Sequence, residues 1–397
     1  MKSILFSICD DFRKIKNVLL EGRLSLWSAG IAIAFIALIL FLWQAPWGVA
    51  GGYRNWGDWF WYLTGLIKEK PQYPWLNGIS LTNLGIFIGA FVSAMSRSEF
   101  RIQPTKPIEC GKAFFGGILM GCGATLAKGC NVGGFYSAIG MFSLGGYFMM
   151  FGLTLGAYLG LRYLVWEMQA FPQKQKVSTI INQNDHVGKE KNEIARILIS
   201  FLLSIAVLII FNIYSKYDHT VEGGQLFFGY LLGWILHRSR FCFVRTFRCP
   251  FMTGDSEMIK VVALSLIIYS AGSAIIKWLY IQPVTMSTYH PFWIGSLAGG
   301  FLFGIGMVIA GACASSTLWR LGEGNIKLLI TLVVFSLVDS FSHYLLWKFG
   351  LSSFLGTGIC IPEGFGWKYT ISIFALFIMG WILLANWNER YEKLTIF

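Results

Sequence analysis

Residues 116–130 read GGILMGCGATLAKGC, and residues 299–313 read GGFLFGIGMVIAGAC. The two stretches agree at seven of fifteen positions with a constant separation of 183 residues, which is too close a match for chance. Closely spaced glycines give a helix a bare surface that lets a second backbone approach. The repeat therefore predicts two related membrane helices, each packed through glycine and each ending in a cysteine.

The helix-packing residues that we predict are the glycines shared by the two stretches. They are Gly116, Gly117, Gly121 and Gly123 in the first stretch and Gly299, Gly300, Gly304 and Gly306 in the second. Cys130 and Cys313 hold the same place at the end of each stretch. We therefore expect their thiols to lie close to a common axis near the middle of the membrane.

The composition predicts an all-α integral membrane protein, because 55% of the residues are hydrophobic, 13% are charged and the mean hydropathy is +0.59. The net charge of +12 does not indicate a nucleic-acid partner, since the basic residues fall in short loops between apolar runs. Eight cysteines are too sparse for a disulfide framework, and no CxxC or zinc-type spacing occurs. We expect free thiols, no metal and no cofactor.

Hydropathy predicts about ten membrane-spanning or partly spanning helices. They lie near residues 24–45, 75–95, 112–130, 144–166, 194–214, 225–236, 259–280, 291–312, 326–348 and 367–386. The stretch 225–236 would cover only about 18 Å as a helix, whereas a hydrocarbon core is about 30 Å thick. It is therefore either a half-helix or the apolar centre of a longer helix.

These spans divide the chain into two membrane halves. We expect a cytoplasmic N-terminal segment (1–23), a first half (24–166), a polar cytoplasmic linker (167–193), a second half (194–386) and a cytoplasmic tail (387–397). Lysine and arginine are concentrated in the loops 97–112, 167–196 and 237–258, which places these loops and both termini in the cytoplasm. The first segment lacks a cleavage site for a secretory signal, so we expect it to be retained.

On this topology the two glycine-rich helices run in opposite directions, which predicts an inverted repeat with the substrate near the midplane. The polar, glycine-bearing stretches after the two cysteines, residues 131–146 and 314–325, are candidates for broken helices. A second echo, RSEF at 97–100 against RSRF at 238–241, follows two spans that point the same way. Either the topology or the full symmetry must therefore fail for that pair.

Three elements of the sequence together resemble the YeeE/YedE family: AKGCN at 127–131, RSRFCF at 238–243 and AGAC at 310–313. The resemblance covers about residues 75–385 and is closest to the longer YedE type, in Cys130-Asn131, Phe247-Arg248 and Glu323-Gly324. It implies a bacterial inner-membrane transporter of small sulfur species, thiosulfate in the best understood branch. The YedE type is associated with selenium metabolism. Both commonly act with a small soluble sulfur carrier of the TusA type.

The resemblance also implies which residues line the substrate path. Transporters of the thiosulfate branch use three cysteines along a narrow central path, and Cys130, Cys313 and Cys242 fit their motifs here. We add two residues near Cys130 to this path. Asn131 directly follows Cys130 in the shared motif, and Lys128 would place an ammonium inside the hydrocarbon region, which is costly unless it lines water or is paired. The first-half element at 97–101, RSEFR, has no cysteine. The order of the cysteines along the path is therefore open.

The chemistry of a thiol suits this role. Its sulfur is polarizable and its S–H group is a weak hydrogen-bond donor, which matches the soft terminal sulfur or selenium of the expected anion. We expect a transporter that imports a small sulfur- or selenium-containing anion, and not an enzyme. One alternative is a membrane sulfurtransferase or thiol redox relay, which would need closely paired cysteines. Another is an accessory membrane protein whose basic loops recruit a soluble carrier.

Several other residues have ordinary explanations. Single cysteines in membrane helices are usually packing residues, and we expect this of Cys9, Cys110, Cys122 and Cys360. The arginines at 238, 240, 245 and 248 are expected to serve as a positive-inside cluster. Asp339 lies in an otherwise apolar span and is a second candidate for function, with His343 one turn later as its expected partner.

Overall fold

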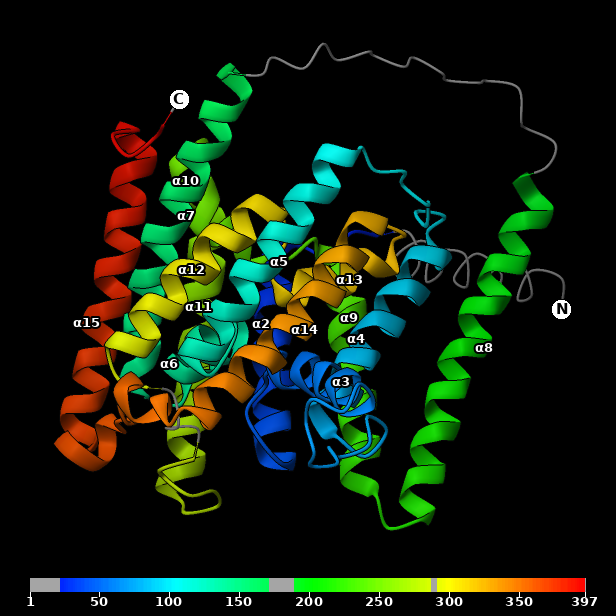
Figure 1. Cartoon of the computed structure of the whole chain (residues 1–397), viewed down its shortest axis with the longest axis horizontal. Coiled ribbons are helices and arrows are strands. Elements are labelled where there is room, and N and C mark those ends of the chain that lie inside the picture. The colour runs from blue at the N-terminus through cyan, green and yellow to red at the C-terminus, as the bar shows by residue number, and fades with distance from the viewer. Residues whose placement is uncertain (1–21, 171–188, 287–290, 397) are drawn as a thin grey trace, which may run out of the picture.

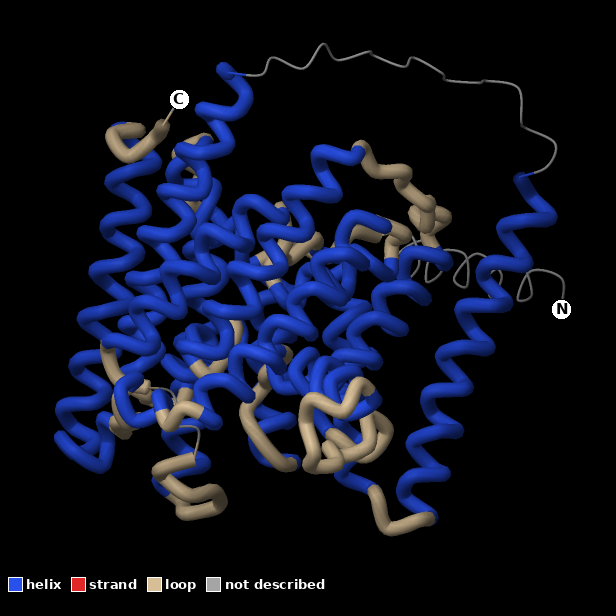
Figure 2. Tube along the Cα trace, viewed as in Figure 1, coloured by secondary structure: helices blue, strands red, loops and turns tan. Residues whose placement is uncertain are grey.

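The computed structural model describes residues 22–170, 189–286 and 291–396, and these residues form helices and loops without a β-strand (Figure 2). Nine of the described helical stretches are long and apolar enough to cross a membrane. The predicted class, an all-α integral membrane protein, is confirmed. Of the predicted segments, residues 1–21 and 171–188 lie outside the described part of the chain.

The described helices follow one another along the chain (Figure 1). Their bounds are α2 Leu26–Trp43, α3 Ala50–Leu63, α4 Gly78–Ser96, α5 Pro107–Ala127, η2 Asn131–Ser137, α6 Ala138–Gly140, α7 Leu144–Ala170, α8 Lys189–Lys216, α9 Thr220–Ser239, α10 Phe243–Met252, α11 Glu257–Trp278, α12 Ile294–Ala310, α13 Ala314–Gly322, α14 Ile326–Lys348, η3 Leu351–Leu355 and α15 Ile361–Tyr391. Here η2 is a short π-helix and η3 a short 3₁₀-helix.

Each of the ten predicted spans corresponds to a helix. The doubtful stretch 225–236 is the centre of α9, whose 20 residues extend about 30 Å. Polar residues at its two ends, Glu222, His237 and Arg238, conceal its length in a hydropathy profile. The ends of α7 and α8 reach into the predicted linker, and α15 continues to Tyr391, inside the predicted tail.

Glycine joins α5 and α12, which run antiparallel. A Cβ added to Gly123 would lie 2.6 Å from the carbonyl oxygen of Gly299, and one added to Gly306 would lie 2.8 Å from that of Gly116. Gly116 corresponds to Gly299 in the repeat, and Gly123 to Gly306, so the contact is reciprocal. Each helix presents the first glycine of its motif to the last glycine of the other.

The other glycines of the repeat pack in a matching way. Gly117 and Gly121 contact Val334 and Val338 of α14, whereas Gly300 and Gly304 contact Met149 and Leu153 of α7. The helix α7 follows α5 after a short broken segment, and α14 follows α12 in the same manner. All eight glycines therefore face another helix. The helix α7 of the first half packs against α12 of the second half, and α14 of the second half packs against α5 of the first.

The helices α4 and α9 are also joined by glycines, but they run in the same direction. Gly89 of α4 approaches Tyr230 of α9, and Gly233 of α9 approaches Ile86 of α4. The sequence echo RSEF and RSRF lies at the ends of these two parallel helices. The predicted topology therefore holds for this pair, and the antiparallel relation of α5 and α12 does not extend to it.

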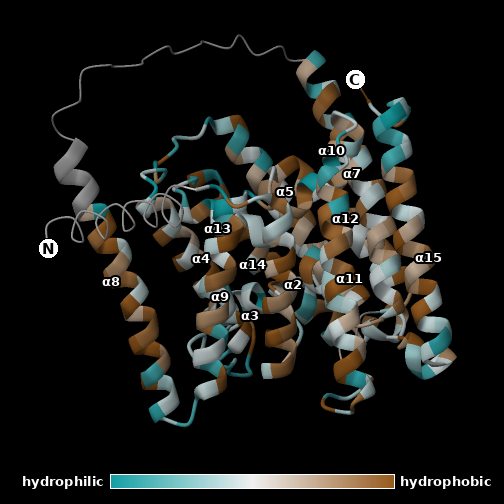
Figure 3. Cartoon of the chain, turned by 180° about the vertical axis from the view of Figure 1, so that it is seen from behind, coloured by the Kyte–Doolittle hydropathy of each residue, from teal (hydrophilic) through white to brown (hydrophobic). Residues whose placement is uncertain are grey.

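The hydropathy of the helices separates the outside of the molecule from its centre. Figure 3 shows apolar residues along α8 and α15, where Phe201 and Leu376 are exposed. Polar residues such as Asn131, Ser316 and Asp339 are instead fully buried at the centre. The protein thus offers an apolar surface to lipid and encloses polar groups where helices break.

Candidate functional site

Three cysteines stand at three helix starts that are built in the same way. Cys130, Cys242 and Cys313 are the N-cap residues of η2, α10 and α13, each with an extended backbone. Two residues before each cysteine the preceding helix ends in a left-handed residue: Lys128, Arg240 and Gly311, with φ of 52°, 55° and 77°. The repeated cysteines at 130 and 313 therefore each lie at a break between two helices, and Cys242 lies at a break with the same backbone geometry.

A helix that restarts inside the membrane exposes backbone N–H groups at its first turn, where the helix dipole is positive. Backbone N–H groups of Ala50, Val132 and Gly133 lie near the sulfur of Cys130, so the first residue of α3 also borders it. The backbone N–H of Cys313 donates to Ser316 Oγ at 2.7 Å, and this hydroxyl lies 3.1 Å from Cys313 Sγ. Both sulfurs thus lie in positive, well-ordered surroundings.

The structure brings the three predicted cysteines together. The thiols of Cys242 and Cys313 lie close enough to interact with each other, and Ser316 lies beside both. Cys130 lies near enough to Cys313 to interact electrostatically, and Tyr53 is adjacent to both. The Tyr53 hydroxyl donates to the carbonyl of Ala314 at 3.0 Å. The cysteines therefore form a series in which Cys313 is the middle member.

The burial of the three thiols changes along this series. Cys130 and Cys313 have no exposed surface, whereas Cys242 is half-buried. Cys242 borders a cavity of about 200 Å³ that is lined by residues from the end of α9, from α10 and from α13. The series thus leads from a closed interior to this cavity.

Asn131 is the most unusual polar residue at this site. Its side chain is fully buried directly after Cys130, and within the described part of the chain neither its Nδ2 nor its Oδ1 has a hydrogen-bond partner. A buried amide without partners costs about 1–3 kcal/mol. The unpartnered amide of Asn131 would therefore stabilise a polar ligand bound beside Cys130.

Lys128 lies at the end of α5, on the other side of the break from Asn131. Its charge acts on His343, which borders a second cavity of about 510 Å³ together with Asp58 and Ser340. Its lining residues come from α3 and the loop after it and from the last turns of α14, which lie at the end of the molecule away from the C-terminal end of α15 (Figure 1). The thiol series thus has one cavity at Cys242 and a second on the Lys128 side of Cys130.

Residues that sequence reasoning missed support the site. Tyr53 and Arg54 belong to α3, which hydropathy did not predict because tryptophan and polar residues fill it. Asp339 Oδ1 accepts from Thr125 at 2.7 Å and from Arg54 at 3.3 Å, so His343 is not its hydrogen-bonded partner as we had expected. A charged residue in the otherwise apolar span 326–348 was the signal that pointed to this cluster.

The remaining cysteines lie apart from the series. Cys360 is the N-cap of α15, and its thiol donates to the carbonyl of Val284 at 3.4 Å. Cys122 is 3.8 Å from the Ser342 hydroxyl, and Cys9 lies outside the described residues. Within the described part of the chain, these contacts of Cys360 and Cys122 do not reach Cys130, Cys242 or Cys313.

Three residues near Cys242 have the donor types of a metal site. Ligand atoms of Glu99, His237 and Glu323 lie within 4.8 Å of one another. The guanidinium of Arg240 binds both carboxylates, with 2.8 Å to Glu99 and a direct contact to Glu323. Since a cation already lies between the carboxylates, we interpret the group as an ion-pair network.

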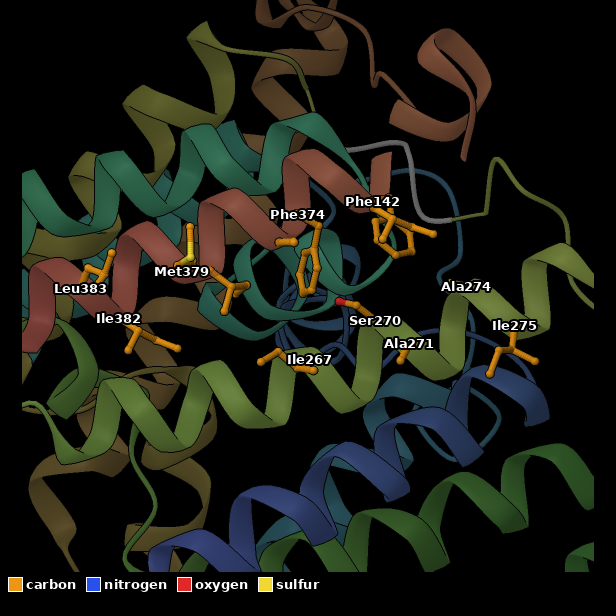
Figure 4. Close-up of a pocket in the computed structure, with 13 residues that line it drawn as sticks. Phe142, Ile267, Ser270, Ala271, Ala274, Ile275, Phe374, Met379, Ile382 and Leu383 are labelled. Carbon is orange, nitrogen blue, oxygen red and sulfur yellow. The ribbon is translucent and has the colours of Figure 1, made fainter. Parts of the chain in front are cut away.

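A groove of about 720 Å³ between α11 and α15 differs in character from this site (Figure 4). Its lining includes Phe142, Ile267, Phe374 and Met379, with Ser270 as a polar member. Figure 4 shows these side chains between the two helices. It has neither the charge nor the thiols that an inorganic anion would require.

Comparison with known proteins agrees with the geometry. A family model described as "Sulphur transport" matches residues 10–159 and 238–396. The chain is 28% identical over 360 residues to "Probable transporter YedE" of Escherichia coli strain K12, a match that covers 87% of this chain and 80% of the relative. It is 30% identical over 190 residues to "Thiosulfate transporter TsuA" of Spirochaeta thermophila, covering 42% of this chain and 56% of that protein.

The fold and the site define a polytopic membrane protein with a buried series of thiols between two cavities. The chain belongs to the sulphur transport family, whose model matches most of its length. The predicted family is thereby confirmed. The relatives of this chain include proteins named as thiosulfate transporters. The chain is also 27% identical to "Probable transporter YedE" of Salmonella typhimurium, a match that covers 86% of this chain and 79% of that protein.

Proposed function

We propose that this protein imports a small sulfur- or selenium-containing anion, such as thiosulfate, past Cys130, Cys313 and Cys242 in that order. The observation that carries the proposal is the contact series of three thiols, each at a helix N-cap. Helix N-termini attract anions, and thiols offer soft, weak hydrogen bonds to terminal sulfur or selenium. The arrangement selects an anion with both a charge and a soft atom.

Passage requires that each binding step is strong enough to admit the anion and weak enough to release it. Neutral thiols and backbone N–H groups meet this requirement better than fixed ammonium groups would. The unpartnered amide of Asn131 supplies a donor and an acceptor directly beside Cys130. Lys128 would attract the anion from the cavity that contains His343 and Asp58.

The direction of passage follows from the positive-inside rule. The basic loops 97–112 and 237–258 belong on the cytoplasmic side, so the cavity next to Cys242 would face the cytoplasm. The cavity next to His343 would then face the outside of a bacterial inner membrane. Both termini would be cytoplasmic, and a pseudo-twofold axis between α5 and α12 would relate α5 and α7 to α12 and α14.

A soluble partner is the next part of the proposal. The cytoplasmic face next to Cys242 also carries the basic loop 97–112, with Arg101 and Lys106, and Glu99 of this loop binds Arg240. A small TusA-like sulfur carrier with an acidic surface would dock there and receive the imported sulfur or selenium. The sequence motifs that this chain shares with the longer YedE type favour selenium as one of the transported elements.

The contact between Cys242 and Cys313 favours a second candidate function, a thiol redox relay or sulfurtransferase. One of the two thiols can take the outer sulfur of thiosulfate as a persulfide, with sulfite as the leaving group, and pass this sulfur to the other thiol. Attack of the second thiol on the inner sulfur of the persulfide would instead give a disulfide and release hydrosulfide. Intact-mass analysis of the protein purified after thiosulfate uptake would separate the two functions. Unmodified thiols support passage alone, whereas a stoichiometric persulfide or disulfide at this pair supports the relay.

The experiment that tests the proposal is uptake of labelled thiosulfate or selenite by cells that lack other uptake systems. Cys130→Ala and Cys313→Ala should each reduce uptake strongly at equal membrane levels of protein, because alanine removes the donor and the polarizable atom. Serine at either position should restore part of the uptake. Cys110→Ala, on the same helix as the glycine motif, is the matched control and should behave as wild type. Normal uptake by both alanine variants would refute the proposal.

A further inference from the structure

The cavity at Cys242 is lined by an unusual density of arginine. Its lining residues are Arg240, Cys242, Val244, Arg245, Arg248, Gly311, Trp319 and Arg320, and we call it the arginine basin. Four of these eight residues carry a guanidinium, and Cys242 is the one member that also belongs to the thiol series. The basin is therefore continuous with the proposed path.

The charges in the basin are only partly balanced. Arg240 is bound by Glu99 and Glu323, and Arg320 donates one bond to the carbonyl of Gly311 at 2.8 Å. Within the described part of the chain, no carboxylate forms an ion pair with Arg245, Arg248 or Arg320. The Nε of Arg248 is buried and has no hydrogen-bond partner there. Three guanidinium groups thus share one cavity without a counter-charge.

A role in orienting the protein in the membrane does not explain this geometry. The positive-inside rule requires lysine or arginine in loops, where water solvates the charge. Here the first turn of α10 begins at Cys242, and its residues Val244 and Arg245 line the basin. The N-terminal end of a helix adds a positive dipole to the arginine charges. The side chains of Arg245, Arg248 and Arg320 are partly exposed, and like charges held in one cavity repel each other unless an anion joins them.

The volume of the basin limits the size of that anion. A water molecule takes about 30 Å³ of liquid volume, so a cavity of about 200 Å³ holds one small tetrahedral oxyanion with a few waters. A nucleotide or a folded peptide segment would not fit. Arginine is suited to such an anion because its planar donors pair with two oxygens at once.

We propose that the arginine basin is a binding site for a small chalcogen oxyanion at the end of the path, with its oxygens on Arg245, Arg248 and Arg320 and its soft atom toward Cys242. The inference rests on the proposed function and names the place where the anion pauses before release. Glu99 and Glu323 hold Arg240 at the rim, so that three arginines rather than four bind the anion. This balance keeps the site weak enough for release.

The binding test measures protection of Cys242 from the neutral reagent N-ethylmaleimide, followed by peptide mass spectrometry on the purified full chain in lipid nanodiscs. Thiosulfate should slow modification of Cys242 in the wild type. In the Arg245→Gln/Arg248→Gln double variant, the concentration for half protection should rise at least about tenfold, because each charged hydrogen bond contributes more than a neutral one. Arg390→Gln, an exposed arginine on the same face, is the matched control and should keep wild-type protection.

The transport test uses oriented vesicles and counterflow of labelled thiosulfate from either side. The double variant should require about tenfold more thiosulfate for half-maximal counterflow from the face that carries the basin. Half-saturation from the opposite face should stay unchanged, which also shows that the variant is folded. Arg248→Lys should lie between wild type and the glutamine variant, since it keeps the charge but loses the paired donors.

The outcomes separate this inference from the proposed function. A wild type that transports no thiosulfate would refute the proposed function itself. A wild type that transports, with equal protection and equal half-saturation in the double variant, would refute the basin alone. Protection of Cys242 by an acidic peptide but not by thiosulfate would also overturn it, in favour of a docking surface for a protein partner.

Discussion

At the scale of single residues, Asn131 and Asn83 are two fully buried amides with different surroundings. Asn83 donates from Nδ2 to the carbonyl of Val49 at 2.9 Å, whereas the Asn131 side chain has no partner within the described part of the chain. A structural role explains the first residue and does not explain the second. An amide kept at a cost in stability beside a thiol is the expected mark of a binding residue.

This contrast gives a prediction with two opposite signs. Asn131→Leu should leave the thermal unfolding midpoint in detergent unchanged or higher, because it removes an unsatisfied amide worth about 1–3 kcal/mol. The same change should lower thiosulfate uptake severalfold. Asn83→Leu is the control and should lower the unfolding midpoint. Loss of stability in Asn131→Leu, with uptake per folded molecule intact, would show that the amide is structural.

Asp339 gives a second prediction at this scale. It is fully buried and binds Thr125 and the guanidinium of Arg54, so Asp339→Leu leaves a cation without its partner. Breaking a buried pair costs about 3–5 kcal/mol, whereas replacing both partners by apolar residues is often nearly neutral. The double variant Arg54→Met/Asp339→Leu should therefore unfold at a higher temperature than Asp339→Leu. An equal or lower midpoint would show that the pair is not coupled.

At the scale of elements, the reciprocal contact of α5 and α12 determines where the two helix breaks lie. Gly123 and Gly299 bring the backbones together, and Ala127 and Ala310 continue the same face to the turns before Cys130 and Cys313. No side chain can shift to make room, because the nearest atoms are backbone. The distance between the two thiols thus depends on glycine at the crossing.

Substitution of glycine on α5 should therefore depend on position. Gly123→Leu should reduce the yield of folded protein strongly, since its Cβ alone would lie 2.6 Å from backbone atoms and overpacking costs about 1–3 kcal/mol or more. Gly111→Leu on the same helix should be tolerated, because no atom lies within 4 Å of its added Cβ. Comparison of monodisperse protein after size-exclusion chromatography measures both. Equal yields would contradict the close contact.

The elements that sequence analysis predicted were those with a strong apolar signal. All ten predicted spans are helices, because their hydropathy exceeds that of their loops over about 20 residues. The short helices α3 and α10 were not predicted, since they are packed within the protein and carry polar residues such as Arg54 and Arg245. The short helix α13 lies in the stretch 314–325, which its polar and glycine residues marked as a candidate broken helix. Hydropathy detects contact with lipid, and these helices have little.

At the scale of the whole molecule, the sequence repeat predicted that Cys130 and Cys313 would share a place in the fold, because equivalent residues of paired helices end near one axis. The position of Cys242 was not predictable from the repeat, since the corresponding element of the first half, RSEFR at 97–101, has no cysteine. Its contact with Cys313 depends on the parallel pairing of α4 and α9, which carries α10 to the centre. That pairing is a tertiary property without a local sequence signal.

The orientation of the molecule can be tested directly. With the basic loops inside, the arginine basin faces the cytoplasm, and an impermeant thiol reagent should modify Cys242 in inside-out vesicles faster than in right-side-out vesicles. Cys110→Ser should be included so that the half-buried thiol at the start of α5 does not contribute. Faster modification in right-side-out vesicles would reverse the proposed direction of passage.

The central claim is that the transported anion passes the contact series of three thiols. The most direct measurement is a crystal structure of the full chain with selenosulfate, in which anomalous scattering locates the selenium atom. The account predicts selenium peaks beside Cys130 and Asn131, beside Cys313, or in the arginine basin at Cys242, and loss of the peaks at residues 130 and 313 in the Cys130→Ala/Cys313→Ala variant. Selenium found only on the lipid-facing surface or in the apolar groove between α11 and α15, at concentrations that saturate uptake, would contradict it.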